Sequence, residues 1–500
     1  MPNFDWDQLA GRIRGTLTLR SDSNYFTTVQ GLVWNAIKPD KFPSAIATVA
    51  DEADVRECVL FARENGLKII VRGGGHNWNG AQVRDGRLVI DLTNLTAVHI
   101  DAARRKAIIQ PIVTNAQNVA ALSAQGLAFP VGDCPPVSAS GYLLGGGLGL
   151  NTPRWGTGCQ NVEAVHVVTA TGESVVADAN HNTELYYAAR GGAQGFPGVV
   201  TRYQLNVHPY PQSIRQCTYV YRLSEAQQFA DWLSDRVLDA PPALQSNTLL
   251  TSTLVAKGVE DITNRFLPEW LMEGFQRVGI GDDPGDGWLV YMGAAFADSD
   301  DEARDLLAPF SKPPEGTKPV CWAGNTPSSF KLLNDFTGAL FPYGRRYVVD
   351  YHWVDIKIGD VIRRVTPNFG RRREADSFML IASYQTPPAD MLPPDSAAFS
   401  MSSNNLVGIY GIGDAPEDDR YNQEWVANMR LLLEPNSLGL YVGEADLSIP
   451  GRARKCYTPE AWARLSEIKK KWDPDDLFAW FIGETSPSAN DTSGGVRRES

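Results

Sequence analysis

The spacing of apolar and polar positions divides the first part of the chain into short strands and helices. The segment 51–66 has helical spacing of its apolar residues and ends at Gly66, which predicts a helix, as does 115–126. Short apolar runs between these helices are typical of strands. Strands are predicted at 44–50, 67–72, 88–92, 97–101 and 106–111.

A second stretch of the same kind follows. Residues 160–178 have the pattern of a β-hairpin with Thr171 and Gly172 at the turn. We predict a helix at 183–192 and then a strand at 198–211 that ends at prolines. A domain boundary is placed near residue 210 because the pattern changes there.

Beyond this boundary, strand-like runs alternate with amphipathic helices, which predicts one antiparallel sheet backed by helices. The last predicted helix is 458–478, and the small polar residues of 485–500 indicate a disordered tail. The fold class is therefore α+β. The predicted units are 1–210, 211–435, a C-terminal return at 436–484, and the tail.

Composition excludes several classes of function. A net charge of −12 argues against nucleic acids and anionic membranes as partners. No apolar run is long enough for a spanning helix, and the N-terminus lacks the pattern of a secretory signal, so a cytoplasmic protein is expected. The 6 cysteines are scattered without a C-x-x-C pair, so no metal site is predicted.

The first candidate for chemistry is the run VRGGGHNWNG, 71–80. Consecutive glycines after a strand allow close approach to a ligand, and their amides can form an anion-binding nest. His76 stands at the exit of this loop. Taken alone, a tight turn with a surface histidine explains it equally well. The dinucleotide fingerprint G-x-G-x-x-G is not matched, which disfavours a Rossmann fold.

The second candidate is GDCPPVSASGYLLGGGLGLNTPRWG, 132–156. Pro135 and Pro136 fix the backbone directly after Cys134, so the thiol can be presented to a bound ring. A small buried hydrophobic residue is the alternative interpretation of Cys134.

The two motifs, about sixty residues apart, together resemble the FAD-linked oxidases of the berberine bridge enzyme-like group, within the vanillyl-alcohol oxidase (PCMH-type) superfamily. The resemblance extends to VIDLTNLTAVHID (89–101), ELYYAARGG (184–192) and WDPDDLF (472–478). It implies a two-part FAD-binding domain and a separate substrate domain. It also implies covalent FAD, with His76 bonded to the 8-methyl group and Cys134 to carbon 6 of the flavin. Amine oxidases similar to hydroxynicotine oxidase share the glycine–histidine run and use the histidine alone, which is the alternative.

The resemblance also assigns the remaining cofactor contacts, which would be made largely by the backbone. Residues near His76 would line the pyrophosphate, and residues after Cys134 would face the ring or the adenosine part. The predicted contacts are Arg72, Gly73, Gly74, Gly75, Asn77, Trp78, Gly141, Gly145, Gly146, Gly147, Leu148, Val199 and Val200.

The catalytic base departs from the family pattern. Many members carry Y-x-N-Y-x-D near the C-terminus, and here the stretch is YVGEAD, 441–446. Tyr441 matches, while Glu444 stands where a tyrosine is usual. A carboxylate in an apolar pocket has a raised pKa, so Glu444 is a candidate base. His352 is a second candidate, on the predicted strand 347–354.

The resemblance implies hydride abstraction from a small organic substrate, followed by reduction of O₂ to H₂O₂. Alcohols, sugars, amines and intermediates of specialised metabolism are all compatible with it. A dehydrogenase with another electron acceptor and a flavin-binding protein without turnover are the alternatives.

Overall fold

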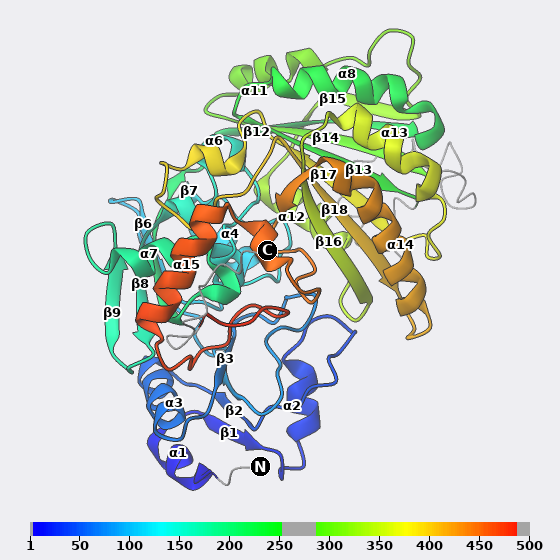
Figure 1. The fold of residues 1–500 in the computed structure, drawn as a ribbon. Helices are drawn as coiled ribbons and strands as arrows, with labels where there is room; N and C mark the ends of the chain where they lie inside the picture. Colours follow the sequence, from blue (N-terminus) through cyan, green and yellow to red (C-terminus); the bar gives the residue numbers. More distant parts are fainter. Residues whose placement is uncertain (1–3, 253–286, 488–500) are drawn as a thin grey trace, which may run out of the picture.

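The structure is a computed structural model that describes residues 4–252 and 287–487. Its elements are stacked in three tiers (Figure 1). The N-terminal helices and strands form the lowest tier, a five-stranded sheet with α15 lies in the middle, and an eight-stranded sheet covered by helices forms the top. The predicted C-terminal tail lies mostly outside the described residues.

The lowest tier is a four-stranded sheet in the order β1-β2-β4-β3. Strands β2 and β3 both pair in parallel with β4, and the apolar face of α3 packs on the sheet through Val55, Val59 and Phe61. Asp51 caps α3 by accepting from two backbone amides. The elements are α1 Trp6–Arg12, β1 Thr16–Leu19, α2 Tyr25–Gly31, β2 Ala45–Thr48, α3 Glu52–Glu64, β3 Ile69–Arg72 and β4 Leu88–Asp91.

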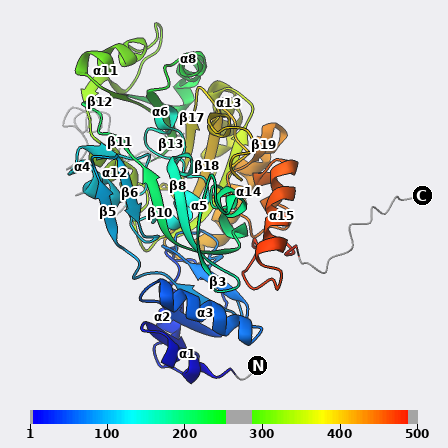
Figure 2. The same cartoon turned by 90° about the vertical axis from the view of Figure 1, so that its left-hand side faces the viewer.

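The middle tier contains an antiparallel sheet in the order β5-β6-β10-β8-β9 (Figure 2). The predicted hairpin is present, and Gly172 in its turn has a φ of +80°. Its strands are β5 Val98–Asp101, β6 Lys106–Ile109, β8 Val162–Thr169, β9 Ser174–Asp178 and β10 Gly198–Asn206. Around them lie α4 Asn115–Ser123, β7 Leu127–Ala128, α5 Ala139–Leu144, α6 Thr152–Trp155, α7 Thr183–Ala188 and β11 His208–Pro209.

The top tier is an eight-stranded sheet in the order β15-β12-β14-β13-β17-β18-β16-β19, with every pairing antiparallel. Its strands are β12 Ser213–Arg222, β13 Leu244–Thr251, β14 Trp288–Ala297, β15 Cys321–Pro327, β16 Arg346–Val354, β17 Phe378–Ser383, β18 Asn405–Gly413 and β19 Ser437–Leu440. Its helices are α8 Gln227–Leu238, α11 Asp300–Leu307, α12 Phe330–Ala339, α13 Ile358–Phe369 and α14 Asp418–Leu433.

The two faces of this sheet serve different purposes. Helices α8, α11, α13 and α14 cover the outer face (Figure 1) and share an apolar core with it. Alternation along β16 sends Tyr351 and Trp353 to the inner face, where they join the core shared with the middle tier. The inner face is therefore the wall against which a ligand between the tiers would lie.

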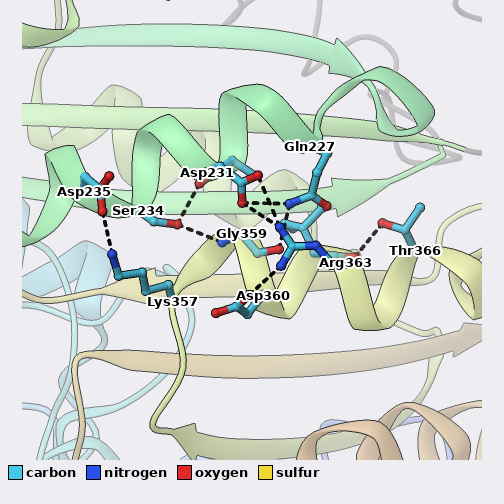
Figure 3. A network of polar contacts seen from close by, with 11 residues as sticks. Gln227, Asp231, Ser234, Asp235, Lys357, Gly359, Asp360, Arg363 and Thr366 are labelled. Atoms are coloured by element: carbon cyan, nitrogen blue, oxygen red, sulfur yellow. Dashed lines mark hydrogen bonds and ion pairs between the residues drawn. The ribbon is translucent and has the colours of Figure 1, made fainter.

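A polar network ties α8 to α13 (Figure 3). Arg363 donates to both oxygens of Asp231, at 3.0 and 3.2 Å, and the Gly359 amide donates to Ser234 at 2.8 Å. A Cβ on Gly359 would lie 2.1 Å from the Asp231 carboxylate, so the two helices meet where one of them lacks a side chain. This contact fixes the helical layer behind the sheet.

The C-terminal segment returns to the lowest tier. Helix α15 Pro459–Trp472 is followed by residues that pair with β3: the Ile69 amide donates to Leu477, and the Ala479 amide donates to Ile69. Asp473 accepts from the Leu477 and Phe478 amides and pairs with Lys469, which shapes the turn. The end of the chain thus extends the sheet that the first residues form.

The predicted α+β class is confirmed. The sequence did not reveal β13, β15, α11, α12 or α13 as separate elements. Among the described residues, no helix combines the length and the apolar character needed to cross a membrane.

Candidate active site

A cavity of about 330 Å³ lies between the inner face of the eight-stranded sheet and the lower tiers. Its wall is assembled from many parts of the chain, and three of them carry the residues predicted for chemistry. The loop after β3 contributes His76, the segment before α5 contributes Cys134, and the C-terminal loop contributes Glu444. The residues that sequence analysis singled out for chemistry therefore meet at one place.

The glycine loop places His76 in the wall. Gly75 has a φ of +77°, and a Cβ on Gly74 would lie 2.5 Å from the Ser138 hydroxyl, so the loop passes closely over the segment that follows Cys134. The His76 ring stacks on Trp34 with centroids 4.9 Å apart. Burial and the nearby charge of Arg72 lower the pKa of His76 to about 4, although a hydrogen bond to the Pro136 backbone opposes them. The imidazole is therefore neutral at pH 7.

Two buried asparagines hold the backbone around Cys134. Asn115, the first residue of α4, donates to the Cys134 carbonyl at 2.9 Å. Asn334 of α12 donates to the carbonyls of Gly132 and Asp133, at 3.1 and 2.9 Å. Burial, with the charges of Glu444 and Asp133, raises the pKa of the Cys134 thiol well above its ordinary value.

The wall contains most of the predicted cofactor contacts. Those lining the cavity are Gly73, Gly74, Gly75, His76, Asn77, Trp78, Cys134, Gly141, Gly145, Leu148 and Val200. Of the described residues, four predicted contacts lie outside the wall: Arg72, Gly146, Gly147 and Val199. Arg72 instead pairs with Asp91 at 3.1 Å and so supports the loop from behind.

Glu444 lies in the cavity, where Trp78 is the one hydrogen-bond donor to its carboxylate among the described residues. The Trp78 indole N–H donates to it, so Trp78 contacts the candidate base as well as lining the cofactor cavity. Burial raises the pKa of Glu444 to about 7; the Trp78 hydrogen bond lowers it and the charge of Asp133 raises it further. A carboxyl with this pKa exchanges protons near neutrality, as a general base must. Tyr441 also lines the cavity, and burial raises the pKa of its hydroxyl.

His352 is placed apart from the cavity wall. It is buried, with Nδ1 3.1 Å from the Ser437 hydroxyl and Nε2 3.3 Å from Asp350. Asp350 accepts from Arg452 at 2.6 and 2.7 Å and from the Asp446 amide at 3.2 Å. This buried cluster contacts the loop that carries Glu444 through the Asp446 amide, and His352 does not line the cavity.

Some wall residues were not predicted as site residues. Asp133 lines the cavity, and burial raises its pKa to about 7. Its Oδ1 atom is buried and has no hydrogen-bond partner among the described residues. Tyr351 and Tyr410 also line the wall, with their hydroxyls hydrogen-bonded to each other. Alternation along β16 places Tyr351 on the inner face, and this pattern could have predicted it as a wall residue. Asp133 could have been predicted from its position next to Cys134.

The wall fits the cofactor that the motifs suggest. The space beside Gly141 is empty, since a Cβ there would meet nothing within 4 Å, so a planar ring can approach the backbone of α5. The Gln82 amide donates to the Leu32 and Gly75 carbonyls, while its Oε1 atom is buried in the wall without a partner among the described residues. That oxygen is free to accept from a ligand hydroxyl.

Comparison with known proteins places the chain in a family. Residues 43–178 match the family described as FAD binding domain, and residues 440–481 match the family described as berberine and berberine like. An uncharacterized FAD-linked oxidoreductase of Bacillus subtilis, YvdP, is 31% identical over 94% of this chain and 97% of its own length. The chain belongs to the berberine bridge enzyme-like family of FAD-linked oxidoreductases.

Other relatives agree with this assignment. The FAD-linked oxidoreductase nodO of Hypoxylon pulicicidum is 29% identical, covering 92% of this chain and 95% of its own. The fold is similar to the crystal structure of 6-hydroxy-D-nicotine oxidase from Arthrobacter nicotinovorans, with a TM-score of 0.76, 22% identity, and coverage of 94% of this chain and 97% of that one. The predicted PCMH-type fold and the prediction of an FAD-dependent oxidoreductase are both confirmed.

Proposed function

We propose that this oxidoreductase carries FAD bonded to both His76 and Cys134 and oxidises a small organic molecule, with Glu444 as the general base. The observation that carries the proposal is the meeting of these three side chains in one cavity wall. Each comes from a different part of the chain, and each is held by its own contacts. Bound FAD supplies the hydride acceptor and then passes the electrons on, by this proposal to O₂ with release of H₂O₂.

The state of His76 supports its part in the linkage. A neutral imidazole has a free lone pair, whereas a protonated one is not a nucleophile. The lowered pKa keeps the ring neutral, and stacking on Trp34 holds its orientation. His76 therefore needs no separate base to become reactive.

Cys134 needs a proton acceptor before it can react, since its pKa is raised and the thiolate is the nucleophile. Glu444 and Asp133, whose charges contribute to that raised pKa, are the neighbouring carboxylates that can take the proton. Forming each link removes one hydrogen from the protein and one from the flavin, and the two electrons leave through the flavin to O₂.

Glu444 is the proposed base in turnover because its pKa of about 7 makes the ionised form available at neutral pH. A proton that leaves a substrate O–H or N–H passes to this carboxylate. The Trp78 hydrogen bond fixes the direction in which the carboxylate faces. Tyr441 stays protonated at neutral pH because its pKa is raised, so it serves as a hydrogen-bond donor.

The linkage is tested by denaturing purified protein in acid and recording its visible spectrum and peptide masses. We expect wild type, His76→Ala and Cys134→Ala each to retain flavin in the pellet, and the double variant His76→Ala/Cys134→Ala to release it. Cys159→Ala is the matched control, because Cys159 is buried nearby without lining the cavity. A colourless wild-type pellet would exclude covalent attachment. Release of all flavin by His76→Ala alone would leave the single-link arrangement.

A further inference from the structure

The charge balance of the cavity is unusual. Two carboxyls, Asp133 and Glu444, line it, and among the described residues of the wall there is no Lys or Arg. The basic side chain in the wall is His76, which is neutral because its pKa is lowered to about 4. Negative charge in this cavity therefore has no counter-charge from the described wall.

Asp133 faces the other polar groups of the cavity. Its charge raises the pKa of Cys134 and Glu444 and of wall tyrosines on three further elements: Tyr142 in α5, Tyr351 in β16 and Tyr384 after β17. Asn334 holds its backbone carbonyl, while its Oδ1 atom is buried without a partner among the described residues. A buried carboxylate oxygen in this state requires a donor, and a bound ligand or a water molecule can supply one.

Aromatic side chains surround the same space. Phe341, Tyr351 and Tyr410 line the wall; the Tyr410 centroid lies 5.1 Å from that of Phe341 and 5.6 Å from that of Tyr351. The hydroxyls of Tyr351 and Tyr410 are hydrogen-bonded to each other, so the pair offers a ligand mainly ring surface. Aromatic rings attract cations through their quadrupole, and the attraction is strongest where water is excluded.

We infer that Asp133 and Glu444, with this aromatic wall, form a binding site for the cationic nitrogen of a protonated amine substrate. The inference rests on the proposed function and names its substrate class. An ammonium group donates to the free Asp133 oxygen and balances the charge of the pair. A neutral polyol supplies a donor but leaves the charge of the two carboxyls unbalanced, and a substrate that places a carboxylate or phosphate directly beside this pair is repelled.

The protonation state of Asp133 and Glu444 should make cation binding depend on pH. The pKa of each carboxyl is about 7, so near neutrality the pair is partly protonated. A bound cation favours the ionised forms, and its affinity therefore rises with pH as the pair loses protons. The three tyrosines stay neutral across this range because burial raises their pKa values, and Cys134 has no thiol to ionise once it is bonded to flavin as proposed.

The test measures binding to flavin-loaded protein by calorimetry with two probes of similar size. Cumylammonium carries N–H donors but no hydrogen on the carbon beside its nitrogen, so it cannot be oxidised by hydride transfer, and cumyl alcohol is its neutral counterpart of the same shape. We expect the cation to bind at least about tenfold more tightly than the alcohol at pH 8.5. Its affinity should fall by about tenfold at pH 5.5, while that of the alcohol stays within about twofold.

Asp133→Asn should weaken binding of the cation by about tenfold and leave the alcohol unaffected. Asp85→Asn is the matched control, since it makes the same change of charge at an exposed loop position paired with Lys41. Equal affinities for the two probes in wild type, or equal effects of the two variants, would overturn the inference. The wild-type pH comparison decides the matter if Asp133→Asn does not fold.

The two proposals fail separately. Covalent flavin in the acid pellet, together with preference for the alcohol, would leave the proposed function standing and remove the amine site. Selective cation binding with a colourless acid pellet would keep the amine site and remove the proposed covalent linkage.

Discussion

Trp78 and Glu444 are separated by 366 positions in the chain, yet the indole N–H of one donates a hydrogen bond to the carboxylate of the other. The contact joins the glycine loop that carries His76 to the C-terminal loop that carries the proposed base. It therefore couples the placing of the cofactor to the protonation of Glu444.

Replacing the base should stop turnover without removing the cofactor. Glu444→Gln keeps the shape of the side chain but accepts no proton, so kcat should fall by about 10² to 10⁴-fold. Glu444→Asp should recover part of the loss. Stopped-flow reduction of the flavin measures the step directly, and the spectrum of denatured protein should still show attached flavin. Normal reduction by Glu444→Gln would exclude Glu444 as the base.

The pH profile should respond to Trp78. The pKa of Glu444 is about 7, and the Trp78 hydrogen bond holds it below the value that burial would give. The ionised form is active, so kcat/KM should rise with pH through this value. Trp78→Phe removes the donor and should move the rise upward by on the order of one pH unit. Trp322→Phe, at a side chain 41% exposed, should leave the profile unchanged.

The hydrogen bonds from Asn334 to the backbone beside Cys134 should be needed for efficient formation of the flavin link through Cys134. Asn334→Ala leaves the Gly132 and Asp133 carbonyls without their donor, which should cost about 1–3 kcal/mol and loosen the thiol. Peptide mapping should then find more protein linked through His76 alone. Asn161→Ala is matched to it, because buried Asn161 donates to the Trp155 and Thr157 carbonyls outside the cavity wall; a similar loss of the Cys134 link there would contradict the prediction.

The buried cluster behind the C-terminal loop should be needed for stability. Asp350→Asn leaves the Arg452 guanidinium buried without a counter-charge, and removing one partner of a buried ion pair costs about 3–5 kcal/mol. Burial raises the pKa of Asp350, but the His352 hydrogen bond and the Arg452 charge outweigh it and lower the pKa. This stability should therefore decline as acid protonates Asp350. The lowered pKa lies below the ordinary value of 3.8, so urea unfolding at pH 7 and at about pH 3 measures both effects, with Asp231→Asn at the exposed α8–α13 network as control.

Gly74 should not tolerate a side chain. A Cβ there would lie 2.5 Å from the Ser138 hydroxyl and 3.0 Å from its Cβ, so the loop over the cofactor cavity must shift. Gly74→Ala should lower the flavin content of purified protein, read from the ratio of visible to ultraviolet absorbance. Gly11→Ala, where nothing lies within 4 Å, should retain full flavin content.

The sequence was sufficient for α3, α4, α7 and most strands between residues 44 and 206, because their apolar spacing and glycine stops are local signals. It did not reveal α1, β1, α2, α5 or α6. The sequence also located Glu444, since a carboxylate stood where the family pattern has a tyrosine. Asp133 required the structure, because its significance lies in an unpartnered oxygen and in neighbours from distant strands. Alternation along β16 puts His352 on the same face as Asp350 and opposite Tyr351, but only the structure shows that the face of Tyr351 is the one that meets the cavity.

The return of Leu477 and Ala479 to Ile69 has a consequence for biosynthesis. Ile69, Phe478 and Ala479 all line the cavity, so its wall is complete only when nearly the whole chain has left the ribosome. A nascent chain that already exposes the glycine loop and Cys134 still lacks Glu444 and the closing strand. By the proposed linkage, flavin attachment follows the synthesis of residues 477–479, and flavin-bearing protein in a cell extract reports chains extended at least that far.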